Sequence, residues 1–125
     1  MAVIQNFEDI QSWKIARKLA KDIYLVSGQG AFCRDSGLRN QICRAVVSIS
    51  SNIAEGFERS SKRDFVNFLH IARGSAGEVR SQLYLALDLG YISQEQFADF
   101  QNRCKDILRL LSALIASLQK ALETK

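Results

Sequence analysis

Residues 93–121, SQEQFADFQNRCKDILRLLSALIASLQKA, decide the fold of this chain. Ser93 and Gln96 have the Ser-x-x-Gln spacing of a capping box, which begins a helix by pairing its first free backbone N–H groups with side chains. Apolar residues then recur in steps of three and four: Phe97, Phe100, Cys104, Ile107, Leu111, Leu114, Leu118 and Ala121. This spacing predicts one long helix that buries one face against neighbouring helices.

Further apolar residues widen the buried face of this last helix: Leu108, Leu110, Ile115 and Leu122. One interpretation is a subunit interface, because a helix inside a bundle needs only a narrow apolar stripe. The other interpretation is a thick core within one chain. The sequence favours neither over the other.

Three more amphipathic segments precede it, over residues 8–26, 37–57 and 60–89. Turn and capping residues separate them, and residues 27–36 are predicted to form a loop. Helices joined by short loops pack as antiparallel neighbours. The sequence therefore predicts an all-α fold, an up-and-down antiparallel four-helix bundle, as a single domain over residues 1–125.

The composition is that of a soluble globular protein, with 47% hydrophobic residues, 24% charged residues and a net charge of +4. The N-terminus lacks the pattern of a signal peptide, and no apolar run is long enough to span a membrane. The three cysteines are odd in number and have no Cys-x-x-Cys spacing. These features predict a cytoplasmic protein with reduced thiols and no membrane partner.

The sequence shows no recognisable arrangement of residues for catalysis or metal binding. His70 is the one histidine, and Asn67 stands where a di-metal bundle needs the glutamate of Glu-x-x-His. No catalytic triad and no glycine-rich phosphate loop can be recognised. We expect no enzyme, no cofactor and no metal, and keep a pocket at Asn52 and Glu55 as a minor alternative.

Asn52 and Glu55 lie three residues apart on a largely apolar helix and should share one face. Polar groups near a core need partners, and the third helix offers Ser75, Glu78 and Gln82. We therefore predict a structural polar network of Asn52, Glu55 and Ser75 between the second and third helices. Close backbone approach at this contact would explain two glycines that cost a helix about 1 kcal/mol each: Gly74 and Gly77.

Basic residues form two candidate nucleic-acid-binding groups. Lys14, Arg17, Lys18 and Lys21 lie on one side of the first helix, at positions i, i+3, i+4 and i+7. The second group lies at the turn between the second and third helices: Arg59, Lys62 and Arg63. No aromatic platform accompanies them, so binding to phosphates should be electrostatic and poorly sequence-selective. The alternative is a solvated helix face.

Several motifs resemble those of one bacterial family. Residues 7–13, FEDIQSW, resemble its opening Phe-x-Asp-Leu-x-x-Trp, and residues 37–45, GLRNQICRA, resemble Gly-Leu-x-x-Gln-Ile-x-Arg-Ala. Residues 48–56, SISSNIAEG, resemble its hallmark Ser-Ile-x-x-Asn-Ile-Ala-Glu-Gly. The remaining matches are Asp64-Phe65, Phe68-Leu69, Ile71 to Ser75, Glu78 and Leu89 to Ile92. By these motifs the chain resembles the proteins encoded within 23S ribosomal RNA intervening sequences, a family that includes the accessory variability determinant of diversity-generating retroelements.

The resemblance implies an up-and-down four-helix bundle, a ring-shaped homopentamer with a basic surface, and no enzymatic activity. The retroelement branch of the family binds nucleic acid and a reverse transcriptase. We therefore expect a homo-oligomer that binds structured RNA or DNA through its basic residues. A protein–protein scaffold or accessory subunit with no nucleic-acid role is the alternative.

Overall fold

The computed structural model describes residues 4–124, and within that range all regular secondary structure is helical. The elements are a 3-10 turn η1 (Phe7–Asp9), α1 (Gln11–Ser27), a short α2 (Gly30–Arg34), α3 (Ser36–Glu58), α4 (Lys62–Asp88) and α5 (Gln94–Glu123). The predicted all-α four-helix bundle is confirmed, with α1, α3, α4 and α5 as its long helices.

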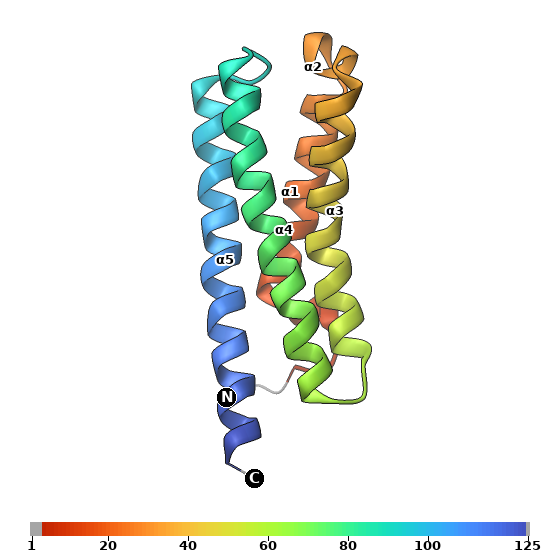
Figure 1. The fold of residues 1–125 in the computed structure, drawn as a ribbon, viewed down its shortest axis with the longest axis vertical. Coiled ribbons are helices and arrows are strands. Elements are labelled where there is room, and N and C mark those ends of the chain that lie inside the picture. The colour runs from red at the N-terminus through yellow and green to blue at the C-terminus, as the bar shows by residue number, and fades with distance from the viewer. Residues whose placement is uncertain (1–3, 125) are drawn as a thin grey trace.

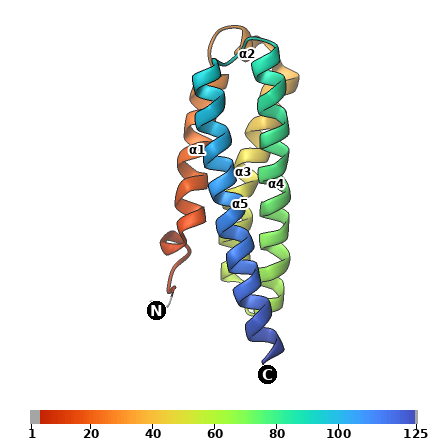
Figure 2. The ribbon, with the colours of Figure 1, turned by 90° about the vertical axis from the view of Figure 1, so that its left-hand side faces the viewer.

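The four long helices run side by side along the long axis and alternate in direction (Figures 1 and 2). Helix α3 packs between α1 and α4, and α5 packs between α4 and α1, which closes the bundle. Helix α1 therefore begins toward the end of the bundle at which α3 connects to α4 (Figure 1). This topology brings the two basic groups predicted from the sequence toward one end.

Side-chain caps begin the three later long helices where the sequence places them. The Ser93 and Gln96 side chains form the complete capping box of α5. The hydroxyl of Ser61 accepts the Asp64 N–H at the start of α4, and the carboxylate of Asp35 accepts the Leu38 N–H at the start of α3. Each cap satisfies a backbone donor that has no partner within its helix.

The prediction of a loop over residues 27–36 is wrong in part, because α2 forms there. Gly30 adopts a left-handed φ of 57°, which only glycine takes without cost, and the chain then turns so that Phe32 is buried. Phe32 stacks on Tyr91, with ring centroids 5.1 Å apart, and the Tyr91 hydroxyl donates to Asp35 at 2.8 Å. This hydrogen bond raises the pKa of Tyr91, whereas the Leu38 N–H is the main cause that lowers the pKa of Asp35.

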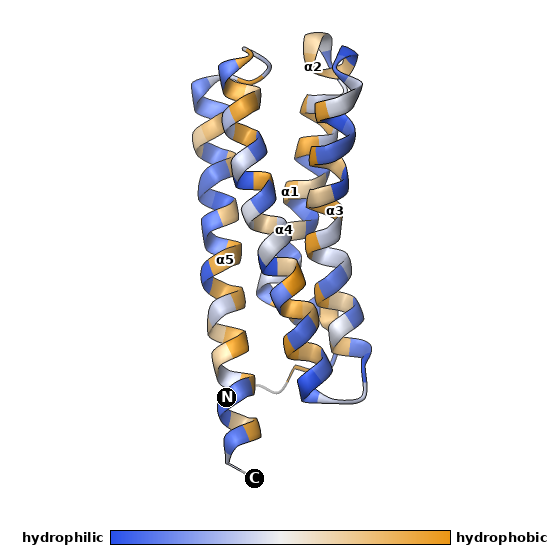
Figure 3. Ribbon diagram, in the orientation of Figure 1, coloured by the Kyte–Doolittle hydropathy of each residue, from blue (hydrophilic) through white to orange (hydrophobic). Residues whose placement is uncertain are grey.

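The core lies along the axis between the four long helices, and apolar stripes run along each of them (Figure 3). In α5, Ile115 is buried, and the other residues that widen its face are at least partly buried. Ile115 and Leu108 therefore contribute to the core of this chain. Large apolar residues that remain exposed on α4 are Ile71, Tyr84 and Leu85, and Leu89 is exposed directly after it. Among the helices of residues 4–124, none is long and apolar enough to cross a membrane.

The close approach of α3 and α4 occurs at a glycine other than the two predicted. A Cβ added at Gly74 or Gly77 would have no atom within 4 Å, so the prediction for these two residues is wrong. A Cβ at Gly56 would lie 2.7 Å from the Phe68 Cβ and 3.3 Å from the Phe65 carbonyl oxygen. Gly56 lies in the last turn of α3, where it is buried and lets the two helices approach.

The three cysteines should differ sharply in reactivity. Cys33 is exposed, whereas Cys43 and Cys104 are buried, and burial raises the pKa of Cys104 to about 12. Because the thiolate is the nucleophile, iodoacetamide at about pH 8 should label Cys33 first and the other two only after unfolding. Mass spectrometry of labelled peptides measures this order. A Cys33→Ser control should stay unlabelled until denaturant is added, and early labelling of Cys104 would contradict the core described above.

Candidate nucleic-acid interface

The basic residues of α1 form one exposed group. Lys14, Arg17, Lys18 and Lys21 are all exposed, and together with Trp13 they line a hollow of about 340 Å³. Their spacing on a regular helix holds the four positive charges along one side of α1. We call these four residues the α1 basic row.

The α1 basic row has no acidic partner. The ion pairs found among residues 4–124 involve Arg59, Arg103 and Arg109, and none involves the row. The acidic residue nearest to the row in sequence is Asp22. One of its carboxylate oxygens lies 2.7 Å from a guanidinium nitrogen of Arg103 on α5. Asp106 of α5 lines a second hollow with Lys14 and Lys18 but forms no ion pair with them, so the row keeps the positive charge that phosphate binding requires.

Arg103 holds Asp22 in a partly buried contact between α1 and α5. It also pairs with Asp99 at 2.8 Å, and its guanidinium lies 5.3 Å from the centre of the Phe100 ring. Burial alone would lower the pKa of Arg103, but the hydrogen bonds to Asp99 and Asp22 outweigh that effect and raise it. Arg103 therefore stays charged and pairs with Asp22, which forms no ion pair with the α1 basic row.

Trp13 is an aromatic neighbour of the α1 basic row, although the sequence predicted no aromatic platform beside it. The ring is partly exposed, packs edge-on against Phe7 with centroids 5.1 Å apart, and carries the Arg17 guanidinium at 5.6 Å from its centre. Its position next to Lys14 in the sequence was the signal that could have identified it. Because this is the one tryptophan of the chain, its fluorescence reports directly on this surface.

The second basic group is less available than the first. Arg59 pairs with Glu55 at 3.0 Å, and its guanidinium lies 4.8 Å from the centre of the Phe68 ring. Lys62 and Arg63 are exposed in the first turn of α4 and have no ion pair within the described residues. The connection between α3 and α4 therefore offers two free charges toward the end of the bundle where α1 begins (Figure 2).

The polar residues between α3 and α4 meet at Ser48. The Asn52 amide donates to the Ser48 carbonyl oxygen at 2.8 Å and to its hydroxyl oxygen at 2.9 Å, and the Ser75 hydroxyl donates to the same hydroxyl oxygen at 2.8 Å. Asn52 and Ser75 are thus linked through Ser48, which sequence reasoning missed. Glu55 lies outside these contacts, because its exposed carboxylate turns to Arg59 one helical turn ahead.

Within residues 4–124, no group of three or more His, Cys, Asp and Glu side chains could hold a metal ion. His70 is exposed on α4 and has no hydrogen-bond or ion-pair partner among the described residues. The basic surface of α1 is therefore the strongest candidate for a functional site.

Comparisons with known proteins agree with the fold. A family model described as 23S rRNA-intervening sequence protein matches residues 8–113. Six chains of solved structures match, one of them a crystal structure of a protein of unknown function from the S23 ribosomal protein family of Bacteroides thetaiotaomicron VPI-5482. The similarity has a TM-score of 0.77 at 29% sequence identity and covers 84% of this chain and 95% of that chain. No curated protein matches.

Proposed function

This chain belongs to the 23S rRNA-intervening sequence protein family, and from that premise we propose that it is a non-enzymatic, homo-oligomeric bundle that binds structured RNA or DNA. We propose a pentamer, in the cytoplasm, with the α1 basic row as its main phosphate-binding surface. Lys62 and Arg63 add to this surface, and Arg59 contributes once its pair with Glu55 opens.

One observation supports the proposal: the four exposed cations of the α1 basic row form no ion pair among the described residues, and Asp22 pairs with Arg103 instead. Charges on bundle surfaces commonly pair at i,i+4, as Arg59 and Glu55 do on α3. Four unpaired cations in one row raise the local positive potential and attract a polyanion. This arrangement supports contact with phosphates, which position a nucleic acid without specifying its sequence.

Assembly into a ring would strengthen a weak surface. Each protomer offers four charges, and a nucleic acid that spans several protomers binds the later copies as intramolecular events. The exposed apolar residues on α4 and directly after it support contact with a second copy, since Ile71 is 52% exposed and Leu85 and Leu89 are each 49% exposed. These apolar side chains are removed from water only if another protein surface covers them.

The proposal is tested by solution mass and by binding at varied salt. Light scattering should give a mass near five times the 14.0 kDa of one chain. Anisotropy titrations with a 23S rRNA fragment and an unrelated duplex DNA should both show binding, because the contacts are to phosphates. If one protomer contacts four phosphates, affinity for duplex DNA should fall by roughly three to four powers of ten for each tenfold rise in salt.

A flat salt response, or no binding at low salt, would contradict the nucleic-acid role. A ring without binding would instead favour the second candidate function, a protein–protein scaffold or accessory subunit. The exposed side chains of Tyr84, Leu85 and Leu89 are the observation that favours it. If the protein is a monomer that binds nucleic acid, the proposed binding surface is supported and the proposed pentamer is contradicted.

A further inference from the structure

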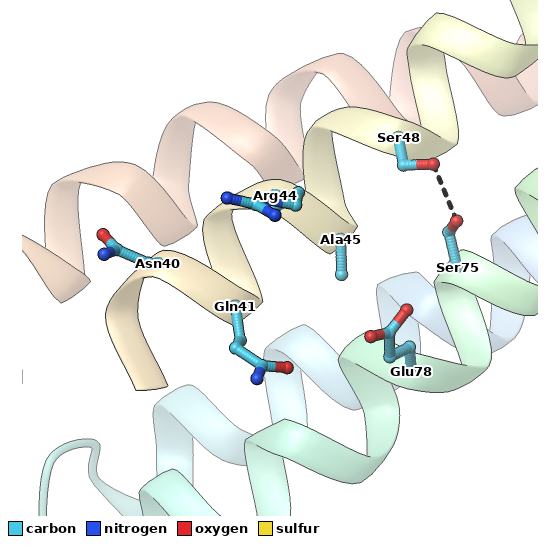
Figure 4. A pocket seen from close by; sticks show the side chains of 7 residues that line it. All are labelled: Asn40, Gln41, Arg44, Ala45, Ser48, Ser75 and Glu78. Carbon is cyan, nitrogen blue, oxygen red and sulfur yellow. Dashed lines mark hydrogen bonds between the residues drawn. The ribbon is translucent and has the colours of Figure 1, made fainter. Parts of the chain in front are cut away.

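A polar cavity lies between α3 and α4, outside the α1 basic row. Its volume is about 500 Å³, which is within the range of small-molecule sites. Figure 4 shows side chains that reach it from both helices, with the Ser48 and Ser75 hydroxyls joined by a hydrogen bond. The lining residues are Asn40, Gln41, Arg44, Ala45, Ser48, Ser75 and Glu78.

The cavity gathers the polar residues of the motifs by which this chain resembles its family. Gln41, Arg44 and Ser48 occupy specified polar positions of the second-helix motifs, and Ser75 and Glu78 are matched on the third helix. The apolar members of the same motifs, such as Ile42 and Ile49, are buried and are explained by the core. Arg44 and Glu78 are exposed at the cavity, so burial in the core does not account for them.

The α3 wall of the cavity has unused hydrogen-bond donors. Arg44 has no ion pair or hydrogen-bond partner among residues 4–124. The Ser48 hydroxyl oxygen already accepts from Asn52 and from Ser75, and no acceptor within the described chain takes its own hydrogen. Figure 4 shows the Arg44 guanidinium extending along α3 toward Asn40 and away from the Ser48 hydroxyl, so Arg44 is the group on this wall that favours a carboxylate.

The α4 wall has unused acceptors. Glu78 has no cationic partner in the described chain, and Figure 4 shows its carboxylate on the side of α4 that faces α3. Gln82 bonds to the lining Gln41 at 3.5 Å, and its side-chain oxygen is buried without a partner. Such acceptors favour an ammonium group. Arg44 and Glu78 form no pair with each other within 4.0 Å, so the space between them is open to a ligand with both charges.

We propose that this cavity binds a small zwitterion of the α-amino acid type, with its carboxylate toward Arg44 and its ammonium toward Glu78. The inference does not depend on nucleic-acid binding, because none of these residues belongs to the α1 basic row. It adds a small-molecule site between α3 and α4.

The test is a titration of the whole protein with each common amino acid, followed by amide chemical shifts in NMR spectra. At least one amino acid should shift the signals of residues lining the cavity. For alanine-sized ligands, L-alanine should bind more tightly than propionate or ethylamine, each of which has one of the two charges. Arg44→Gln and Glu78→Gln should each weaken binding by about tenfold or more, because each removes a charge-assisted contact.

Matched controls are Lys105→Gln and Glu95→Gln, two exposed charge removals on α5 that should leave affinity unchanged. The proposal is overturned if no amino acid moves the cavity signals, or if a singly charged analogue binds as tightly as its amino acid. Unchanged binding in Arg44→Gln and Glu78→Gln would also overturn it. So would a change in the mass of the assembly in these variants, because a second copy of the chain would then cover the cavity.

Discussion

Replacing Gly56 with alanine is expected to lower the free energy of unfolding by about 2 kcal/mol. The new Cβ would lie 2.7 Å from the Phe68 Cβ and 3.3 Å from the Phe65 carbonyl oxygen, so α4 itself must move. Overpacking of this kind costs about 3 kcal/mol at the upper end of its usual range. Alanine recovers about 1 kcal/mol through its higher helix propensity. Urea unfolding followed by circular dichroism measures the difference.

Gly74→Ala is the matched control, because Gly74 also lies inside a long helix but has open space around it. The same chemical change should there raise the free energy of unfolding by up to about 1 kcal/mol. The two variants therefore shift stability in opposite directions. A tolerated alanine at Gly56, or equal losses at both positions, would contradict the close contact of α3 and α4 at Gly56.

Changing the whole α1 basic row to glutamine is expected to reduce duplex DNA affinity by roughly a thousandfold at physiological salt, if each of the four residues contacts one phosphate. The variant should fold normally, because Lys14, Arg17, Lys18 and Lys21 are exposed. The salt dependence should flatten as well, since fewer counterions are released on binding. Anisotropy titrations of labelled DNA measure both effects, and circular dichroism checks the fold.

The control removes the same number of charges elsewhere, so that both variants fall from a net charge of +4 to zero. Its four positions are exposed on α2 and α5: Arg34, Lys105, Arg109 and Lys120. If the α1 basic row binds phosphates directly, this control should lose far less affinity. Equal losses of DNA affinity in the two variants would mean that net charge alone attracts the nucleic acid. The α1 basic row would then not be the phosphate-binding surface.

Sequence spacing was sufficient to place the α1 basic row on one side of a helix, because i, i+3, i+4 and i+7 neighbours follow from helix geometry alone. It could not show whether those charges are free. Asp22 is one residue from Lys21 in sequence, yet it pairs with Arg103, 81 residues away. The position of Trp13 beneath Arg17 likewise depends on how far the ring enters the core.

The polar contact between α3 and α4 shows the same limit. Asn52 and Ser75 were predicted to form a polar network because polar groups near a core need partners. The way α3 packs against α4 makes Ser48 the residue to which both of them bond. Glu55 was expected to face the third helix, and it turns outward to Arg59 instead. Close approach was expected at Gly74 and Gly77, because a glycine inside a helix suggests a contact with a neighbouring helix. The sequence does not show whether that glycine faces the neighbouring helix, and these two have open space around them.

Local sequence patterns were sufficient to predict the all-α class, the four long helices, the capping box at Ser93 and the family of the chain. These properties depend on residues within a few positions of one another, where local geometry and hydrophobic periodicity are enough. The approach of α3 to α4 at Gly56, the pairing of Asp22 with Arg103, and the meeting of Arg44 and Glu78 at one cavity became visible only in the folded chain. Each of these depends on the axial register and rotation of packed helices, which are set by side-chain interlocking across the core.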